Sequence, residues 1–425
     1  MSGCCSRRGV RSLIARSERF PCRRPHYDGS EPFGGDPTQN QVAAQHQPDW
    51  RRLMKAAIAR GIGQFSVEDI DVPHPSFGEV LVRVEAAGVC HTDLTALSGG
   101  LPVPMPFVLG HEGAGIVEAV GTGVTALAPG DHVVLSITSG CGRCPACQRS
   151  AFSLCEIASA HVLAGTMLDG TTRLSKGSEH LHSFMFQSSF AEYAVVPASC
   201  AVKVRADAPL EVAALLGCGA STGYGAVVRR AQVQPGETVL VIGAGGVGLA
   251  VVMTARLAGA QRIIVADKSD AALRLAAELG ATDTVLVGSG GADISDEALR
   301  LVGGGVDFAF DVVGARGTLE QAFKAVRPGG KAIAIGMADA SLTVTVPLME
   351  LIFEKQLTGT YNGSIQPHVD IPAALDAFMA GRLPLDRLVS RKYPLDQVGQ
   401  ALDDMTSGGG GRGVIVPKSR GRATK

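Results

Sequence analysis

Four closely spaced cysteines give the strongest chemical signal in the sequence. They follow the pattern C-x2-C-x2-C-x7-C and are Cys141, Cys144, Cys147 and Cys155. Four thiolates complete a closed tetrahedral zinc shell that leaves no position for a substrate, so such a site has a structural role. An iron–sulfur cluster is the competing interpretation, but no further cysteine-rich segment or redox partner accompanies the four. The spacing therefore predicts a structural zinc lobe.

A glycine-rich loop suited to a dinucleotide lies further along the chain. It follows an apolar run that predicts a strand, Thr238–Ile242, and it opens a helical stretch. In such a loop the first glycine makes the turn, the second admits a pyrophosphate to the backbone, and the third packs helix on strand. The helix N-terminus adds positive potential. These features predict a dinucleotide site at Gly243, Gly245, Gly246, Val247 and Gly248.

An acid at the end of the next expected strand bears on which dinucleotide binds. Asp267 follows the loop at about the 20-residue distance where a carboxylate binds the ribose 2′-hydroxyl. Because that carboxylate would repel a 2′-phosphate, NAD is favoured over NADP, although the neighbouring Lys268 weakens this preference. The alternative role for Asp267 is a helix N-cap.

Three scattered residues could form a second, open metal site. Cys90, His111 and Cys218 offer two thiolates and one imidazole, which would leave a fourth position for water or substrate. Taken singly, a cysteine is more often a small buried hydrophobe and a histidine a hydrogen-bonded structural group. Their spacing alone does not join them.

The segment from about 54 to 417 resembles the zinc-dependent medium-chain alcohol dehydrogenase family of the MDR superfamily. The resemblance rests on the four-cysteine pattern and, in chain order, on GVCHTD, GHEGAG, GCGASTGYG and VIGAGGVG. It implies an α/β fold in which a GroES-like, β-rich catalytic domain, built from both ends of the chain, accompanies a Rossmann domain with a doubly wound parallel sheet. It also implies a catalytic zinc on Cys90, His111 and Cys218, with the substrate in the cleft between the domains.

The same resemblance suggests roles for residues around that zinc. The hydroxyl of Thr92 would take the alcohol proton, and Asp93 and Glu112 would support the metal ligands. For these two acids the alternative is ordinary surface charge. Nearer the cofactor, Thr222 would pack against the nicotinamide. The pyrophosphate would be contacted by His91 and Arg412.

Several positions depart from the family pattern. Thr95 stands where the proton relay usually ends at a histidine, and His91 stands where many members carry arginine. The glutathione-dependent formaldehyde dehydrogenase branch has charged residues at the positions of Leu101 and Ser159, so a glutathione substrate is disfavoured. Ile137 stands where the family often has an aromatic residue and would widen the pocket for bulky primary alcohols; the alternative for Ile137 is simple core packing.

The remaining sequence indicates how these residues are positioned. Residues 54–155 read as short antiparallel strands, 156–190 as a long surface loop, and 219–356 as alternating strands and helices, which is typical of a parallel sheet. We expect a catalytic domain at 54–218 and 357–417 and an NAD-binding domain at 219–356. Residues 1–53 predict a disordered extension, with an arginine-rich transit peptide as the alternative, and 418–425 a basic tail.

Composition excludes several classes of protein. Of 425 residues, 46% are hydrophobic and 19% charged, which is enough for a large core, and the net charge of −1 provides no basic field for nucleic acid. The longest apolar run, residues 239–255, is interrupted by glycines and predicts strand, loop and helix instead of a membrane span. Clustered cysteines indicate metal in a reducing compartment, which predicts a cytoplasmic protein.

The sequence thus predicts an alcohol dehydrogenase with two zinc ions per chain. It would transfer hydride reversibly between NAD and a primary alcohol, bulky, allylic or aromatic, and would form a homodimer or homotetramer. An alternative is a dehydrogenase acting on the adduct of formaldehyde with a thiol. A zinc-free quinone or enoyl reductase and a non-catalytic NAD-binding protein are further alternatives.

Overall fold

The computed structural model describes residues 52–138, 140–288, 293–407 and 411–417. The predicted extension at 1–53, apart from its last two residues, and the predicted tail at 418–425 lie outside the described residues. The chain divides into units 1–47 and 48–425. Everything below concerns the second unit.

Six parallel strands form one sheet, as the sequence predicts for the Rossmann domain. The strand order β13-β12-β11-β14-β15-β16 places later strands on both sides of β11, which is the doubly wound arrangement. The apolar run of β11 is almost wholly buried, as expected for a strand covered on both faces. The strands are β11 Thr238–Ile242, β12 Arg262–Asp267, β13 Asp283–Leu286, β14 Val306–Asp311, β15 Val326–Ala334 and β16 Gln356–Gly359.

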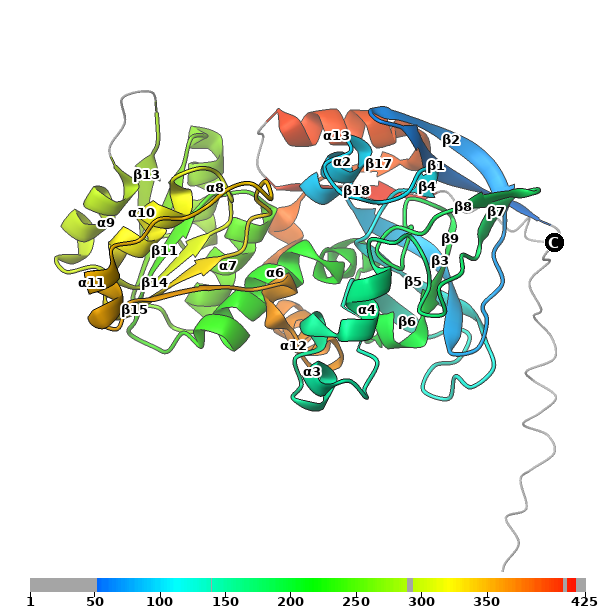
Figure 1. Cartoon of the computed structure of the whole chain (residues 1–425), viewed down its shortest axis with the longest axis horizontal. Coiled ribbons are helices and arrows are strands. Elements are labelled where there is room, and N and C mark those ends of the chain that lie inside the picture. Colours follow the sequence, from blue (N-terminus) through cyan, green and yellow to red (C-terminus); the bar gives the residue numbers. More distant parts are fainter. Residues whose placement is uncertain (1–51, 139, 289–292, 408–410, 418–425) are drawn as a thin grey trace, which may run out of the picture. The chain divides into compact units, whose positions relative to one another are not determined.

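Helices connect these strands and flank the sheet (Figure 1). They are α7 Gly246–Leu257, α8 Asp270–Leu279, α9 Ile294–Val302 and α10 Thr318–Ala325. Strand β16 pairs with β15, so the sheet continues to Gly359, three residues beyond the predicted limit of 356. A shorter helix, α11 Leu348–Ile352, precedes β16.

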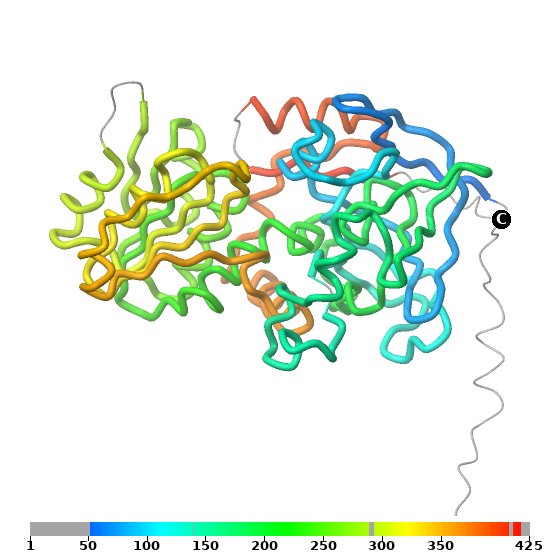
Figure 2. The backbone as a smooth tube through the Cα atoms, in the orientation of Figure 1, coloured from blue at the N-terminus to red at the C-terminus, as the bar shows by residue number. Residues whose placement is uncertain are grey.

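A mostly antiparallel sheet of seven strands has Cys90 just after its strand β3 and His111 just before its strand β5. Its order is β10-β6-β5-β3-β18-β17, with β9 also paired to β3. The strand nearest the C-terminus lies beside β3, with Ile415 opposite Ala87, so both ends of the chain build one sheet (Figure 2). The strands are β3 Glu79–Gly88, β5 Gly113–Val120, β6 His132–Leu135, β9 Tyr193–Pro197, β10 Ala201–Lys203, β17 Val389–Pro394 and β18 Arg412–Val416.

Smaller elements complete the described chain. A second sheet contains β1 Leu53–Gly61, β2 Gln64–Asp71 and β4 Phe107–Val108. The other helices are α2 His91–Leu97, α3 Pro145–Gln148, α4 Glu156–His161, α5 Leu210–Ala213, α6 Gly219–Gly225, α12 Pro367–Met379 and α13 Val398–Thr406. Short helical turns include η4 Ala214–Gly217, η5 Ala226–Ala231 and η6 Asn362–Ser364.

The prediction of a long surface loop at 156–190 is wrong. The segment contains α4 and a hairpin of β7 Leu174–Lys176 and β8 Glu179–Leu181. Its last part is buried, because Phe184, Phe186 and Phe190 are each at most 1% exposed. Three aromatic side chains within seven residues bury too much apolar area to remain at the surface, and they outweigh the polar residues between them.

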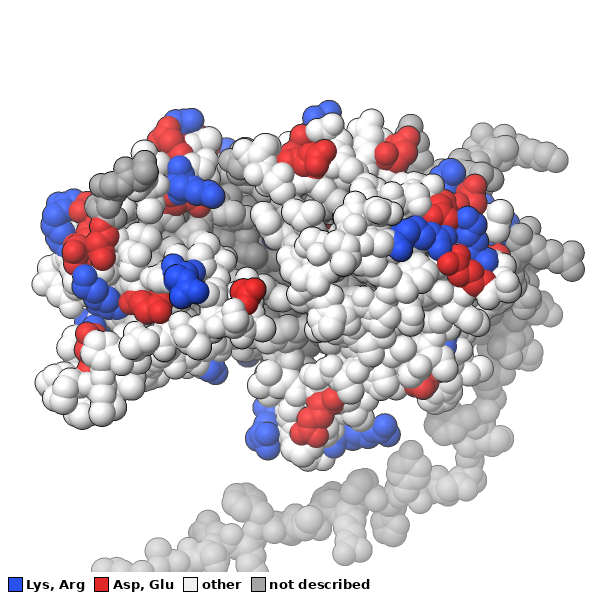
Figure 3. Space-filling model, turned by 45° about the horizontal axis from the view of Figure 1, so that its top comes forward, with Lys and Arg blue, Asp and Glu red and all other residues white. Residues whose placement is uncertain are grey.

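Surface features agree with the composition. On the face drawn in Figure 3, acidic and basic side chains are interspersed among uncharged residues. No single helix of the described chain is both long and apolar enough to cross a bilayer. By length and composition alone, the pair 210–217 and 219–231 reaches that threshold together, with a 62° bend between its halves.

Candidate active site and metal centres

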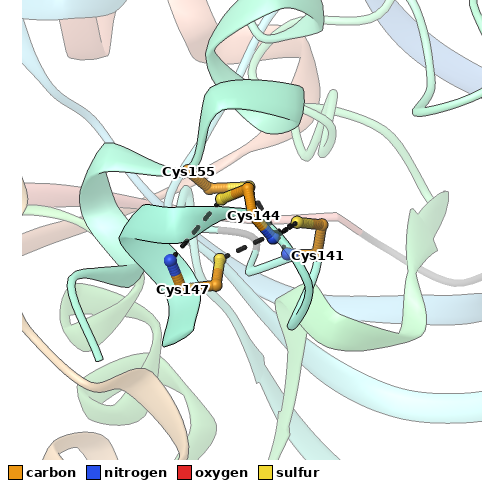
Figure 4. A group of neighbouring side chains, drawn as sticks. All are labelled: Cys141, Cys144, Cys147 and Cys155. Atoms are coloured by element: carbon orange, nitrogen blue, oxygen red, sulfur yellow. Dashed lines mark hydrogen bonds between the residues drawn. The ribbon is translucent and has the colours of Figure 1, made fainter. Parts of the chain in front are cut away.

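The four cysteines of the predicted zinc lobe lie together. Their sulfur atoms are all within 4.8 Å of one another, and they point toward a common centre (Figure 4). The Cys141 and Cys147 sulfurs are 3.9 Å apart, and those of Cys144 and Cys155 are 4.0 Å apart. Sulfurs about 2.3 Å from a tetrahedral zinc would be separated by about 3.8 Å. The spacing in the structure therefore fits a zinc ion held by four thiolates.

Local structure prepares these sulfurs for negative charge. Backbone N–H groups donate to them, including Cys144 N to Cys141 Sγ at 3.3 Å and Ala158 N to Cys155 Sγ at 3.5 Å. Such bonds lower the pKa of Cys141 and lower that of Cys144 to about 6. Burial raises the pKa of Cys147 to about 12. This thiol would therefore lose its proton near neutral pH only with a cation beside it.

A second cluster gathers the three scattered residues predicted to bind a catalytic metal. Cys90 caps the start of α2, His111 lies between β4 and β5, and Cys218 lies between η4 and α6. Their ligand atoms and a carboxylate oxygen of Glu112 all fall within 4.8 Å of one another. The sequence predicts that Glu112 supports the metal ligands, but its carboxylate is close enough to the other three groups to bind the metal itself.

The imidazole of His111 is oriented for a metal. Its Nδ1 lies 2.9 Å from Asp93 Oδ1, while Asp93 Oδ2 accepts from the backbone N–H of Cys90 at 3.0 Å. His111 Nε2 is buried and has no hydrogen-bond partner among the described residues, and the same holds for Glu112 Oε2. Buried polar atoms without partners are costly, so the positions of these two atoms suit the binding of a cation. Asp93 and Glu112 are fully buried, which excludes the surface-charge alternative.

The charges of this cluster are strongly interdependent. The neighbouring Cys218 thiol, and then Arg412, lower the pKa of Cys90, and the resulting thiolate raises the pKa of Cys218. Burial raises the pKa of Glu112 to about 7, although Arg412 Nη1 lies 2.7 Å from its Oε1. Without a cation, Cys218 therefore remains a thiol beside the Cys90 thiolate, and a divalent cation would allow both sulfurs to lose their protons.

Glycines in the motifs allow the cluster to close. A Cβ on Gly88 would collide with the carboxylate of Glu112 and lie 3.2 Å from the Cβ of Glu112. A side chain on Gly217 would lie 2.6 Å from the carbonyl oxygen of Leu135 and 3.0 Å from the Cα of Glu112. Glycine at these two positions therefore lets the segments that precede Cys90 and Cys218 pack closely against Glu112.

The glycine-rich loop has the geometry expected for a dinucleotide. Gly243 has φ +103°, which favours glycine. A side chain on Gly248 would collide with the carbonyl oxygen of Gly243 and lie 3.2 Å from Val312 Cγ2. No atom of the described residues lies within 4 Å of a Cβ placed on Gly245, which leaves room for a phosphate near the start of α7.

Asp267 ends β12 and faces the loop. Its Oδ2 accepts from the Ala244 N–H at 2.7 Å and its Oδ1 from the Ser269 N–H at 2.8 Å. The N-cap of α8 is Ser269, so the alternative N-cap role for Asp267 is wrong. The acid therefore fixes the loop and stands at the carboxyl end of a strand, where ligands of this fold bind.

The remaining predicted site residues differ in how closely they join these groups. The Cys90 thiol lies 3.6 Å from Thr92 Oγ1, and Thr222 Oγ1 lies 2.7 Å from the carbonyl oxygen of Cys218. A side chain on Gly246 would lie 2.7 Å from Arg412 Nε, so this arginine reaches both the glycine-rich loop and Glu112. The side chains of His91 and Lys268 are exposed and make no hydrogen bond or ion pair with the described residues.

Sequence analysis missed two residues that support the metal cluster. The ring of Phe184 meets that of His111 edge to face at 5.4 Å. Gln187 is buried, and its Nε2 donates to Leu135 O at 2.9 Å while its Oε1 accepts from Gly113 N at 3.0 Å. The amide thus joins β5 and β6 at the end beside His111. The available signal was the aromatic spacing of FMFQSSF, which the loop interpretation overlooked.

Two family models match the chain. Residues 76–206 match one described as "Alcohol dehydrogenase GroES-like domain", and residues 246–380 match one described as "Zinc-binding dehydrogenase". The chain is also 39% identical over 364 residues to S-(hydroxymethyl)glutathione dehydrogenase of Synechocystis sp. The aligned region covers 85% of this chain and 99% of the relative.

Two solved structures have the same fold over nearly the whole described chain. An alcohol dehydrogenase zinc-binding domain protein from Burkholderia ambifaria has a TM-score of 0.83 and 40% identity, covering 87% of this chain and 100% of that one. Benzyl alcohol dehydrogenase from Acinetobacter calcoaceticus has a TM-score of 0.82 and 34% identity, covering 86% and 100%. These matches confirm the predicted fold class.

Proposed function

Because this chain belongs to the zinc-dependent medium-chain alcohol dehydrogenase family, we propose that it oxidises a primary alcohol with NAD, reversibly, at a zinc ion. Cys90, His111 and Cys218 would hold the ion. The observation that carries the proposal is the buried Nε2 of His111, which has no hydrogen-bond partner in the described part of the chain and lies within 4.8 Å of two thiol sulfurs. Three protein ligands leave one position for the substrate, as in other catalytic zinc sites.

The surrounding residues have separable tasks in this proposal. A zinc ion in the cluster would supply a Lewis acid that favours the alkoxide form of the alcohol. Asp93 Oδ1, 2.9 Å from Nδ1, would hold His111 in the tautomer whose Nε2 can bind the metal. The Thr92 hydroxyl, beside Cys90, would accept the alcohol proton. Thr95 takes the place of the relay histidine, so water would carry the proton onward.

We also propose NAD as the hydride acceptor. The open space at Gly245 and the positive end of α7 would receive the pyrophosphate, with Arg412 within reach of Gly246. Asp267 would accept from the ribose hydroxyls and repel a 2′-phosphate. His91 and Lys268 are exposed and would contact the cofactor only at its edges.

The proposal extends to the organisation of the chain. We propose a second, structural zinc in the four-cysteine lobe, a catalytic domain at 54–218 and 357–417, and an NAD-binding domain at 219–356. Exposed apolar residues around α11, with Leu348 71% and Phe353 60% exposed, support a homodimer or homotetramer. A reducing, cytoplasmic location suits two thiolate metal sites.

A thiol-adduct formaldehyde dehydrogenase is the second candidate function. The similarity to S-(hydroxymethyl)glutathione dehydrogenase, at 39% identity, favours it. Leu101 and Ser159 argue against glutathione itself, because neither offers a charge to pair with the tripeptide. The similarity to benzyl alcohol dehydrogenase, at 34% identity, favours a bulky alcohol.

Turnover assays on the full-length protein test these functions. NADH fluorescence would be followed with NAD or NADP and with ethanol, long-chain, allylic and benzylic alcohols, and separately with formaldehyde plus assorted thiols. We expect turnover with NAD and a bulky alcohol, two zinc ions per chain, and no turnover in Cys90→Ser that still binds NADH. Activity of Cys90→Ser equal to that of the unmutated protein would contradict the zinc mechanism, and activity without any zinc would point to the zinc-free reductases.

A further inference from the structure

A buried asparagine next to the proposed active site has no role in the function described so far. Asn362 begins η6, just after the carboxyl end of β16, and is 6% exposed. It has φ +45°, followed by φ +65° at Gly363 and φ +56° at Ser364. Asparagine tolerates this left-handed region better than most side chains, and residues held there cluster at functional sites.

The carboxamide of Asn362 joins segments that are far apart in the sequence. Its Nδ2 donates to Thr138 Oγ1 at 2.7 Å, and its Oδ1 accepts from Thr222 Oγ1 at 2.9 Å. Ser221 Oγ lies 3.4 Å from the same Oδ1. All these side chains are buried. Both polar atoms of the amide are therefore used in a water-poor setting, where hydrogen bonds define geometry strongly.

Each partner belongs to a different part of the proposed site. Thr222 lies on α6, one turn after the proposed zinc ligand Cys218, and its single hydroxyl hydrogen is shared between Asn362 Oδ1 and the carbonyl oxygen of Cys218. Thr138 follows β6 and the proposed pocket residue Ile137. Helix α6 also packs on α7, the helix that the glycine-rich loop opens. Asn362 thus links the substrate side, the metal ligand and the cofactor side.

Backbone packing holds the turn against α6. A side chain on Gly363 would lie 2.5 Å from the carbonyl oxygen of Thr222, and one on Gly225 would lie 2.9 Å from the carbonyl carbon of Gly363. The turn and the helix therefore touch backbone to backbone. This contact fixes the position of the Asn362 amide relative to α6. Because Asn362 is bonded to Thr222, a shift of the turn would also move Thr222.

We propose that Asn362 is a positioning residue for hydride transfer. Resting on the proposed function, it locks the hydroxyl of Thr222 to that of Thr138 and so sets the distance between the nicotinamide and the alcohol carbon. A displacement of about 1 Å can lower a rate about a hundredfold when reacting atoms must meet in line. No atom of Asn362 takes part in the chemistry itself.

Two substitutions remove this link in different ways. Asn362→Gly deletes the amide while keeping a residue that adopts φ +45° without strain. Thr138→Val replaces the acceptor hydroxyl by a methyl of similar shape, and Thr138→Ser keeps the hydroxyl. Thr360→Val is the matched control, because it removes a hydrogen bond in the same turn, to Ser364 Oγ at 2.7 Å, that does not reach α6.

The assay compares kcat with protonated and deuterated alcohol, NADH affinity, zinc content and thermal midpoint in the full chain. For Asn362→Gly we expect kcat to fall about tenfold to a hundredfold with a larger deuterium isotope effect, because hydride transfer becomes slower than the other steps. NADH affinity and zinc content should change little. Thr138→Val should show the same pattern, Thr138→Ser should restore activity, and Thr360→Val should behave as the unmutated protein.

Other outcomes overturn the inference. A kcat of Asn362→Gly or Thr138→Val within about twofold of the unmutated value, or a loss that parallels zinc loss or unfolding, would show a structural role only. If Asn362→Gly does not fold, the Thr138 pair decides. Inactivity of the unmutated protein on every substrate would instead reject the proposed function, and this inference with it.

Discussion

Two glycines of the same loop are expected to respond in opposite ways to one added methyl group. Gly245→Ala places the methyl where no atom lies within 4 Å, and the backbone there, φ −75° and ψ −173°, is open to any residue. Replacing glycine at such a position stabilises a protein by about 0.4–1 kcal/mol, through the lower entropy of the unfolded chain. Gly245→Ala should therefore raise the free energy of unfolding slightly.

Gly248→Ala meets backbone instead of open space. Its methyl would collide with the carbonyl oxygen of Gly243 and lie 2.9 Å from the carbonyl carbon. Gly243 is itself fixed, because its N–H donates to Ala266 O at 2.8 Å. Overpacking typically costs about 1–3 kcal/mol. Since the obstacle is backbone and not a flexible side chain, we expect about 3 kcal/mol of destabilisation.

In NADH affinity we expect the opposite order: Gly245→Ala, the more stable variant, binds the cofactor more weakly. The methyl of Gly245→Ala would occupy the space proposed for the pyrophosphate, so we expect NADH to bind about tenfold more weakly, or about 1.4 kcal/mol. Gly248→Ala should lose stability first and affinity only as its loop is displaced. Urea unfolding and NADH fluorescence titration measure the two quantities, with zinc content as the check on intact protein.

The reasoning would be refuted by either of two results. Gly245→Ala that binds NADH as tightly as the unmutated protein would show that the pyrophosphate does not approach this backbone. Gly248→Ala with unchanged unfolding free energy would show that α7 can move away from β11 at little cost, against the close packing observed.

Two further predictions concern the supports of the metal sites. Gln187→Leu should lower the free energy of unfolding by about 2 kcal/mol or more. The reason is that Gly113 N–H and Leu135 C=O lose their buried partner, at a cost of about 1–3 kcal/mol each. A loss of less than about 0.5 kcal/mol in urea unfolding would show that other groups replace the amide. Cys155→Ser should reduce the zinc content from two ions to one and lower the thermal midpoint, since structural zinc contributes folding energy; unchanged stoichiometry by elemental analysis would contradict a four-thiolate site.

Local patterns carried most of the fold prediction. The run Thr238–Ile242 is β11 and Asp270–Leu279 is α8, because apolar periodicity and glycine positions define such elements within a few residues. The four cysteines of the lobe are likewise close in sequence, so their spacing alone indicated a shared centre. The parallel sheet followed from the alternation of strands and helices.

Contacts between distant segments had no such signal. The pairing of β18 with β3 and the ion pair of Arg412 with Glu112 join opposite ends of the chain. The predicted catalytic cluster depended on resemblance to a family, because no spacing rule links Cys90 to Cys218. Asn362 was missed for the same reason: its partners are set by tertiary packing, and an Asn-Gly pair in the sequence indicates only a turn.

Charge explains why the Cys90 cluster is more than a set of buried polar groups. Two carboxylates, Asp93 and Glu112, and two thiols share a buried space with the Arg412 guanidinium and the His111 imidazole. If both thiols lose their protons, the negative charges outnumber the positive ones even with His111 protonated, and an unbalanced buried charge is costly. Protonation can remove part of the excess, as the pKa of about 7 at Glu112 indicates, but it leaves His111 Nε2 without a partner. A divalent cation would balance two thiolates and give His111 Nε2 a partner, so the arrangement of these groups supports a metal site.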